Sequence, residues 1–117
     1  MELAVQVDER GGWAVAVVSG DLDLTTAPGL RERVIEVVLR GQPNVILDLQ
    51  GVDFIDSTGL GVLVGLLKRT RTHGGDLRLV STRPSLCRML ELTGLERALP
   101  LADRVETALR TGASPEG

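Results

Sequence analysis

The stretch that decides the fold is DFIDSTGLGVL, residues 53–63. The short apolar run of residues 45–47 precedes it and predicts a buried central strand. We expect that strand to end at Leu49, with a short acidic loop over residues 51–56 after it. Apolar residues then recur at helical spacing and predict a helix from Ser57 to about His73. The stretch is therefore predicted to be a junction of strand, loop and helix.

Outward from this junction, the chain alternates between strand and helix patterns. Strands are predicted at residues 3–9, 13–18, 77–79 and 98–101, and helices at about 26–40, 82–93 and 102–110. Thr25 or Thr26 is expected to cap the first helix, and Thr82 the third. Such alternation predicts an α/β fold, a single-domain mixed β-sheet of about five strands with about four α-helices. The domain should span residues 1–111, with 112–117 as a flexible tail.

Composition excludes several classes of function. The net charge of −3 leaves no basic footprint for nucleic acid, and aromatic residues make up only 2% of the chain. No apolar run approaches 18 residues and no signal peptide is visible, so we expect a cytoplasmic protein without a membrane span. Cys87 is the only cysteine, and its apolar helical surroundings predict a small core residue.

Carboxylates gather around the junction. Asp21, Asp23, Asp53 and Asp56 are all expected in loops that follow strands, and loops after parallel neighbours meet at one edge of the sheet, where such sheets usually bind ligands. Asp56 or Ser57 can also accept hydrogen bonds from the first amides of the following helix. The alternative is that these residues are only a helix cap and solvent-exposed residues of turns, where aspartate is common.

Glycines in the first turns of the predicted helix are the second unusual feature. Gly59 and Gly61 each cost a helix roughly 1 kcal/mol relative to alanine, and they would let a partner's backbone approach closely. For Gly61 and Gly65, close packing of the helix on its own sheet explains the pattern equally well. The helix is apolar around most of its circumference, so part of it is either covered or a contact surface.

The residues of an enzyme are missing from the sequence. A serine hydrolase elbow needs glycine two residues before the serine, where this chain has Ile55, and the only histidine, His73, is roughly 24 Å away along the helix. A receiver domain needs lysine near the end of its last strand, but the only lysine, Lys68, is within a predicted helix. We therefore expect no catalytic residue, no cofactor and no metal ligand.

Two motifs resemble one known family. DFIDSTGLG (residues 53–61) is similar to the signature of the STAS domain, specifically of the bacterial anti-sigma factor antagonists. GDLDLTTAP (residues 20–28) resembles that family's other characteristic stretch, with Asp21 where glutamate is usual. The two motifs stand in the right order and at the right separation, and the predicted element order agrees over about residues 3–110.

The resemblance implies a partner switch. An antagonist of this kind binds an anti-sigma factor that is also a serine kinase with its own ATP site, and thereby frees a sigma factor. The kinase then phosphorylates the serine aligned with Ser57, the phosphorylated form lets go, and a serine phosphatase resets it. Thr58 is the alternative phosphosite. The implied partner-binding residues are Asp21, Asp23, Thr25, Asp56, Ser57, Thr58, Gly59, Leu60 and Gly61.

Physical chemistry predicts the direction of such a switch. A phosphate adds roughly −1.5 to −2 charge, which Asp53, Asp56 and Asp23 would oppose and which must be desolvated when a partner docks. We therefore expect lost binding rather than unfolding. The alternative function is a STAS-type scaffold or regulatory subunit in a signalling complex or lipid-transport machinery. The chain is expected to be a monomer or a weak dimer, with the Trp13 strand as a candidate self-pairing edge.

Overall fold

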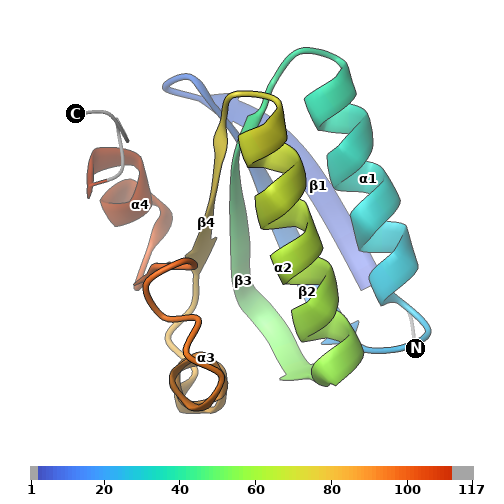
Figure 1. Ribbon diagram of the computed structural model, residues 1–117, viewed down its shortest axis with the longest axis vertical. Helices are drawn as coiled ribbons and strands as arrows, with labels where there is room; N and C mark the ends of the chain where they lie inside the picture. The colour runs from blue at the N-terminus through green and yellow to red at the C-terminus, as the bar shows by residue number, and fades with distance from the viewer. Residues whose placement is uncertain (1–2, 112–117) are drawn as a thin grey trace.

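The computed structural model describes residues 3–111, and its elements confirm the predicted order of β, β, α, β, α, β, α, β, α (Figure 1). The strands are β1 (Leu3–Arg10), β2 (Trp13–Leu22), β3 (Asn44–Ile55), β4 (Asp76–Val80) and β5 (Leu101–Ala102). The helices are α1 (Ala27–Leu39), α2 (Ser57–Thr72), α3 (Pro84–Leu92) and α4 (Val105–Thr111). The tail expected at residues 112–117 lies outside the described residues.

The strands form one five-stranded sheet in the order β1-β2-β3-β4-β5. The β1 and β2 strands form an antiparallel hairpin, whose turn uses positive φ angles at Gly11 and Gly12. Each later neighbour is parallel, which requires the helical crossovers seen between them. The predicted α/β fold with a mixed sheet is confirmed.

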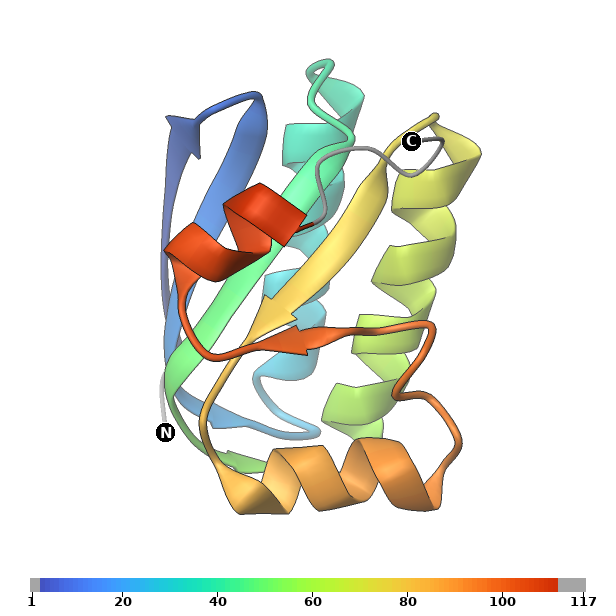
Figure 2. The same cartoon turned by 90° about the vertical axis from the view of Figure 1, so that its left-hand side faces the viewer.

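Alternating side chains of the sheet fill two separate clusters. Ala14, Ala16 and Val18 of β2 face α1 and α2 and join the main core, in which the α2 leucines 60, 63, 66 and 67 are also buried. Trp13 and Val15 belong to a second cluster, which includes Val105 and Ala108 of α4. Figure 2 shows α4 lying over the opposite face of the sheet. Helix α3 lies across the lower end of the sheet (Figure 2). The sheet is therefore a middle layer, and the starts of α1 and α2 meet at one end of it.

Two central strands run further than the sequence predicts. β2 continues to Leu22 and β3 to Ile55, so the expected end of β3 at Leu49 and the expected loop at 51–56 are wrong. The two strands keep pairing through two register shifts, which join Ser19 to Gly51 and later Leu22 to Ile55. Glycine is required at the first of these, since a Cβ on Gly51 would lie 2.9 Å from the Ser19 Cβ. Because the pairing is irregular, the last parts of β2 and β3 do not show the strict alternation of apolar and polar residues by which a strand is recognised in a sequence.

Three smaller predictions are also wrong. The cap position of α3 is Arg83 and not Thr82, and it makes no side-chain capping bond, because an arginine side chain has no acceptor atom for the first amides of the helix. Cys87 is exposed, since it lies on the outer side of α3 while Leu86 and Leu90 face the core. The last strand is residues 101–102 and not 98–101.

Candidate functional site

Asp56 joins the two loops that meet at the start of α2. Its Oδ1 accepts a hydrogen bond from the Gly59 N–H at 2.9 Å, which makes it the N-cap of α2. Its Oδ2 accepts from the Leu24 N–H at 3.3 Å, in the loop between β2 and α1. One carboxylate therefore caps the helix and fixes a loop from 32 residues earlier in the chain.

Leu22, the last residue of β2, also contacts the start of α2. Its side chain is fully buried, and its carbonyl accepts a hydrogen bond from the Asp56 N–H at 3.2 Å. A Cβ on Gly59 would lie 2.7 Å from the Leu22 carbonyl oxygen, closer than real Cβ atoms come. Gly59 is needed for this internal approach, whereas Gly61 and Gly65 have no atom within 4 Å of a Cβ, so they are not explained by packing on the sheet.

The β2–α1 loop is held by its own side chains. The Asp23 carboxylate accepts hydrogen bonds from the N–H groups of Thr25 and Thr26 at 3.0 and 3.1 Å. The Thr26 hydroxyl accepts from the Asp23 N–H and donates to the Asp21 carbonyl at 2.6 Å. Thr26 is the N-cap residue of α1, as one of the two predicted candidates, but its side chain makes no cap hydrogen bond and turns back into the loop. The backbone of this loop is held by Asp23 instead, because its carboxylate reaches the N–H groups of both threonines.

Ser57 is the first residue of α2, and its side chain is exposed. Thr58 beside it is half-buried, and Gly61 is exposed one turn further on. Gly59 and Leu60 are buried, so these two members of the predicted binding set position the surface and do not present atoms to it. The hydroxyl most open to a visiting protein in this turn is therefore that of Ser57.

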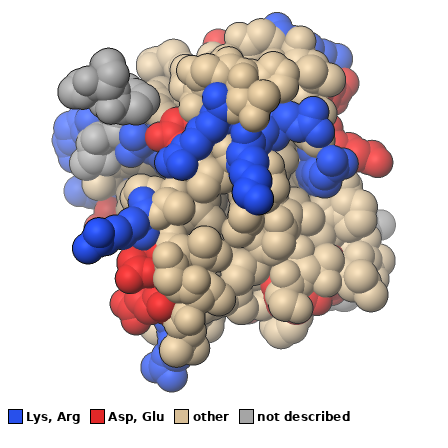
Figure 3. Space-filling view, in the orientation of Figure 1, with Lys and Arg blue, Asp and Glu red and all other residues tan. Residues whose placement is uncertain are grey.

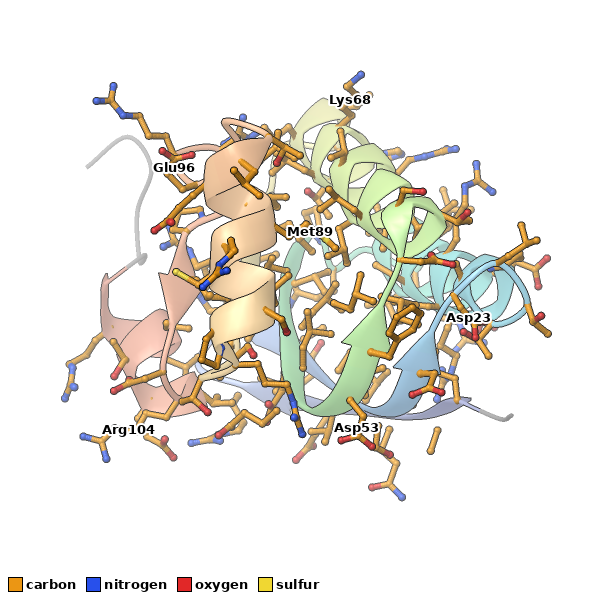
Figure 4. The ribbon with its side chains drawn as sticks, turned by 90° about the horizontal axis from the view of Figure 1, so that it is seen from below. Asp23, Asp53, Lys68, Met89, Glu96 and Arg104 are labelled. Atoms are coloured by element: carbon orange, nitrogen blue, oxygen red, sulfur yellow. The ribbon has the colours of Figure 1, made fainter. Side chains whose placement is uncertain are left out.

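The four aspartates predicted to share one edge are only partly brought together. Asp21 and Asp53 lie within strands rather than loops. Figure 4 looks onto this end of the molecule and shows Asp23 beside the start of α1, while Asp53 lies apart from it across the sheet. The Asp53 carboxylate forms an ion pair with the Arg83 guanidinium at 2.8 Å, which offsets its charge. Asp56 and Asp23 remain as the carboxylates of the two connected loops.

Basic side chains lie at the other end of the face formed by α1 and α2. Figure 3 shows them in a band across its upper half, while the lower half, where both helices begin, is mostly uncharged. In α2 they are Lys68, Arg69 and Arg71, and the nearest is about 16 Å from Ser57 at 1.5 Å per residue. A phosphate on Ser57 would meet no cation of α2 within its first turns.

Two exposed apolar side chains flank this turn and were missed in the sequence. Leu24 is 71% exposed, and its N–H is the one bound by Asp56. Phe54 is 53% exposed near the end of β3, and its register partner in β2 is Asp21. A leucine between acidic and hydroxyl residues in GDLDLTTAP was the available signal for Leu24, whereas Phe54 was assigned to the wrongly predicted loop.

The part of the chain that the structure describes holds no group of three or more His, Cys, Asp or Glu side chains placed to bind a metal ion. Over the same residues, no helix is both long enough and apolar enough to cross a bilayer.

Comparison with known proteins agrees with the geometry. The sequence profile of the STAS domain matches residues 4–108. The anti-sigma F factor antagonist of Paenibacillus polymyxa is 31% identical over 110 residues, covering 93% of this chain and 94% of that protein. The anti-sigma-B factor antagonist of Bacillus subtilis (strain 168) is also 31% identical, over 91% of this chain and 96% of that protein.

A solved structure is similar over nearly the whole fold. The crystal structure of an anti-sigma factor antagonist from Mycobacterium paratuberculosis superposes with a TM-score of 0.85 at 30% identity, covering 96% of this chain and 95% of that chain. With a family profile over nearly all of its length and relatives of nearly equal length, the chain belongs to the STAS domain family, among the bacterial anti-sigma factor antagonists.

Proposed function

We propose that this protein binds an anti-sigma factor that is also a serine kinase, and that phosphorylation of Ser57 ends the binding. The observation that carries the proposal is the position of Ser57, an exposed hydroxyl on the first residue of α2, directly after the Asp56 carboxylate that connects two loops. The role is regulatory: the partner supplies ATP and the chain supplies the acceptor. A serine phosphatase would return the chain to its binding form in the bacterial cytoplasm.

The proposed contact surface consists of the exposed and half-buried residues around this turn. It comprises Asp21, Asp23, Leu24, Thr25, Phe54, Asp56, Ser57, Thr58 and Gly61. Leu24 and Phe54 offer exposed apolar area near this turn, as the centres of protein interfaces usually do. The Asp56 bonds hold both loops before the partner arrives, so little ordering entropy is lost on docking.

Phosphorylation of Ser57 has one favourable and several unfavourable electrostatic effects on docking, and the unfavourable ones outweigh the other. The N-terminus of α2 favours an anion, because its first amides and the helix dipole are positive. Against this, the dianion lies next to the Asp56 carboxylate, and α2 offers no basic side chain before Lys68. In the free protein, water solvates the added charge, whereas in the complex that water must leave. The net effect is a folded protein that no longer binds.

The experiment is incubation with the cognate kinase and ATP, followed by mapping of the modified residue by mass spectrometry. The proposal expects phosphate on Ser57 and on no other residue. Ser57→Ala should bind the kinase as tightly as the unmodified chain and remain bound when ATP is added, with Thr58→Ala as the matched control that is still modified and released. Phosphate on Thr58, or release of the Ser57→Ala variant by ATP, would refute the assignment.

A further inference from the structure

β1 is an edge strand with an uncovered outer side. Within residues 3–111, its sheet partner is β2 alone, and Figure 2 shows it along the margin of the sheet. The expectation that the Trp13 strand forms the edge is wrong, because β2 lies between β1 and β3. Residues 3–7 of β1 carry no charge, although charged side chains are the usual protection of an edge against pairing. Backbone groups along this side are free to bond another strand.

A groove runs beside this edge on the face that carries α1. Leu3 and Val5 of β1 form one wall, and Gly29, Leu30 and Arg33 of α1 form the other. Gly29 has no atom within 4 Å of a Cβ, so the groove is open there. An added strand would therefore find both backbone partners and a partly apolar groove for its side chains.

The β1 strand is complementary to itself when it pairs antiparallel about Gln6. In that register, Leu3 lies opposite the second copy's Glu9, Ala4 opposite its Asp8, and Val5 opposite its Val7. Like charges never face each other, and the valines form a cross-strand apolar pair. Because opposite residues share a face of the sheet, both copies keep α1 on the same side.

Charge is also complementary across this pairing. Glu9 projects on the α1 face, since its carboxylate accepts a hydrogen bond from the Gln42 side chain in the loop that follows α1. The antiparallel register carries the second copy's Glu9 opposite Leu3, and Leu3 lines the same groove as Arg33. Within residues 3–111, the ion pair of Arg33 is a long one to Glu36, at 4.0 Å, which leaves room for a closer carboxylate. Two-fold symmetry makes the contact twice.

We propose that a second copy of this chain docks on the β1 edge, which joins two five-stranded sheets into one and pairs Arg33 of each copy with Glu9 of the other. The inference does not rest on the proposed partner switch. Ser57 lies at the start of α2, outside this edge, so phosphorylation is expected to leave the dimer unchanged. An interface of this kind is small, so the dimer is expected to be weak and concentration-dependent.

The test is sedimentation equilibrium of the full chain over a range of concentrations with a charge-swap series. Wild type should show a monomer–dimer equilibrium. Arg33→Glu and Glu9→Arg should each raise the dissociation constant of the dimer by about 10-fold or more, because each places like charges together. The double variant should return it to within about threefold of wild type, since the pair is restored with reversed sign.

Arg31→Glu is the matched control, because it makes the same charge change on an exposed residue of α1 outside this groove, and it should leave the equilibrium unchanged. Three results would overturn the proposal: wild type that stays monomeric at its highest soluble concentration, single swaps without effect, or a double variant as weak as the singles. A dimer that survives the swaps would mean that another surface joins the copies.

Discussion

The carboxylate of Asp56 accepts a hydrogen bond from the backbone N–H of Leu24 at 3.3 Å, although 32 residues separate them in the chain. The same carboxylate caps α2 through the Gly59 N–H. The β2–α1 loop and the start of α2 therefore behave as one unit, and the phosphate acceptor proposed for the switch is the residue that follows Asp56.

Replacing Asp56 by alanine removes both hydrogen bonds. We expect the free energy of unfolding to fall by about 1–2 kcal/mol, the usual cost of losing an N-cap, with a further cost from the lost bond to the neighbouring loop. Asp56→Asn should lose less, because an amide oxygen can still accept the Gly59 N–H bond. Urea unfolding followed by circular dichroism measures the difference. Equal stability of Asp56→Ala and wild type would mean that the connection contributes nothing.

Alanine at Gly59 and at Gly61 should change stability in opposite directions. The Gly59→Ala Cβ would collide with the Leu22 carbonyl oxygen and should cost about 1–3 kcal/mol, as overpacking generally does. At Gly61 the space is open, so alanine should raise helix stability by up to about 1 kcal/mol.

The same pair of variants tests why Gly61 is a glycine. If a partner's backbone approaches α2 there, Gly61→Ala should bind the kinase more weakly while unfolding at a higher temperature. Calorimetric titration gives the affinity and thermal unfolding gives the stability. An affinity equal to that of wild type would exclude close approach at Gly61.

The exposed apolar residues Leu24 and Phe54 should matter for binding and not for folding. Changing either to serine should weaken binding of the kinase by about 1–2 kcal/mol, as truncation of apolar anchors in interfaces does. Stability should change little, since both side chains are largely exposed. Leu39→Ser is the control, because Leu39 is 65% exposed at the far end of α1. Equal losses for all three variants would point to a nonspecific effect.

Cys87 should react slowly with thiol reagents despite its exposure. A hydrogen bond from its thiol to Glu91, together with the negative charge of that carboxylate, raises the pKa of Cys87. The thiolate is the reactive form, so the rate of modification should rise only at a higher pH than for an ordinary cysteine. Glu91→Gln should shift the pH profile of the modification rate toward lower pH. Glu96→Gln should shift it less, because Glu96 raises the pKa of Cys87 by less. An unmoved profile in Glu91→Gln would contradict this cause.

Element order and sheet type could be predicted because hydrophobic periodicity reports them directly. The alternation of apolar residues in β1 and the helical spacing in α2 are local patterns, and both elements lie where they were predicted. The ends of β2 and β3 could not be predicted, since their pairing passes through register shifts that depend on two distant segments fitting together. The same holds for the bond between Asp56 and Leu24, which joins residues that no local pattern relates.

The sequence predicted which residues lie at the start of α2 better than it predicted which of them are exposed. Ser57 lies exposed at a helix start as expected, and Asp56 is one of the two caps proposed. Gly59 and Leu60 belong to the same motif but face the interior, and Asp53 is paired with Arg83, a residue 30 positions later. A motif in the sequence does not show which of its residues are buried and support the surface and which are exposed on it.

The affinity of the kinase for the two forms of the chain tests the central claim most directly. Calorimetric titration should be run with the unmodified protein and with protein carrying a single phosphate on Ser57. Burying an uncompensated charge at an interface costs about 2–5 kcal/mol, so we expect the phosphorylated form to bind at least about 30-fold more weakly while its unfolding curve stays nearly unchanged. Equal affinity of the two forms, or loss of binding that comes from unfolding, would contradict the account.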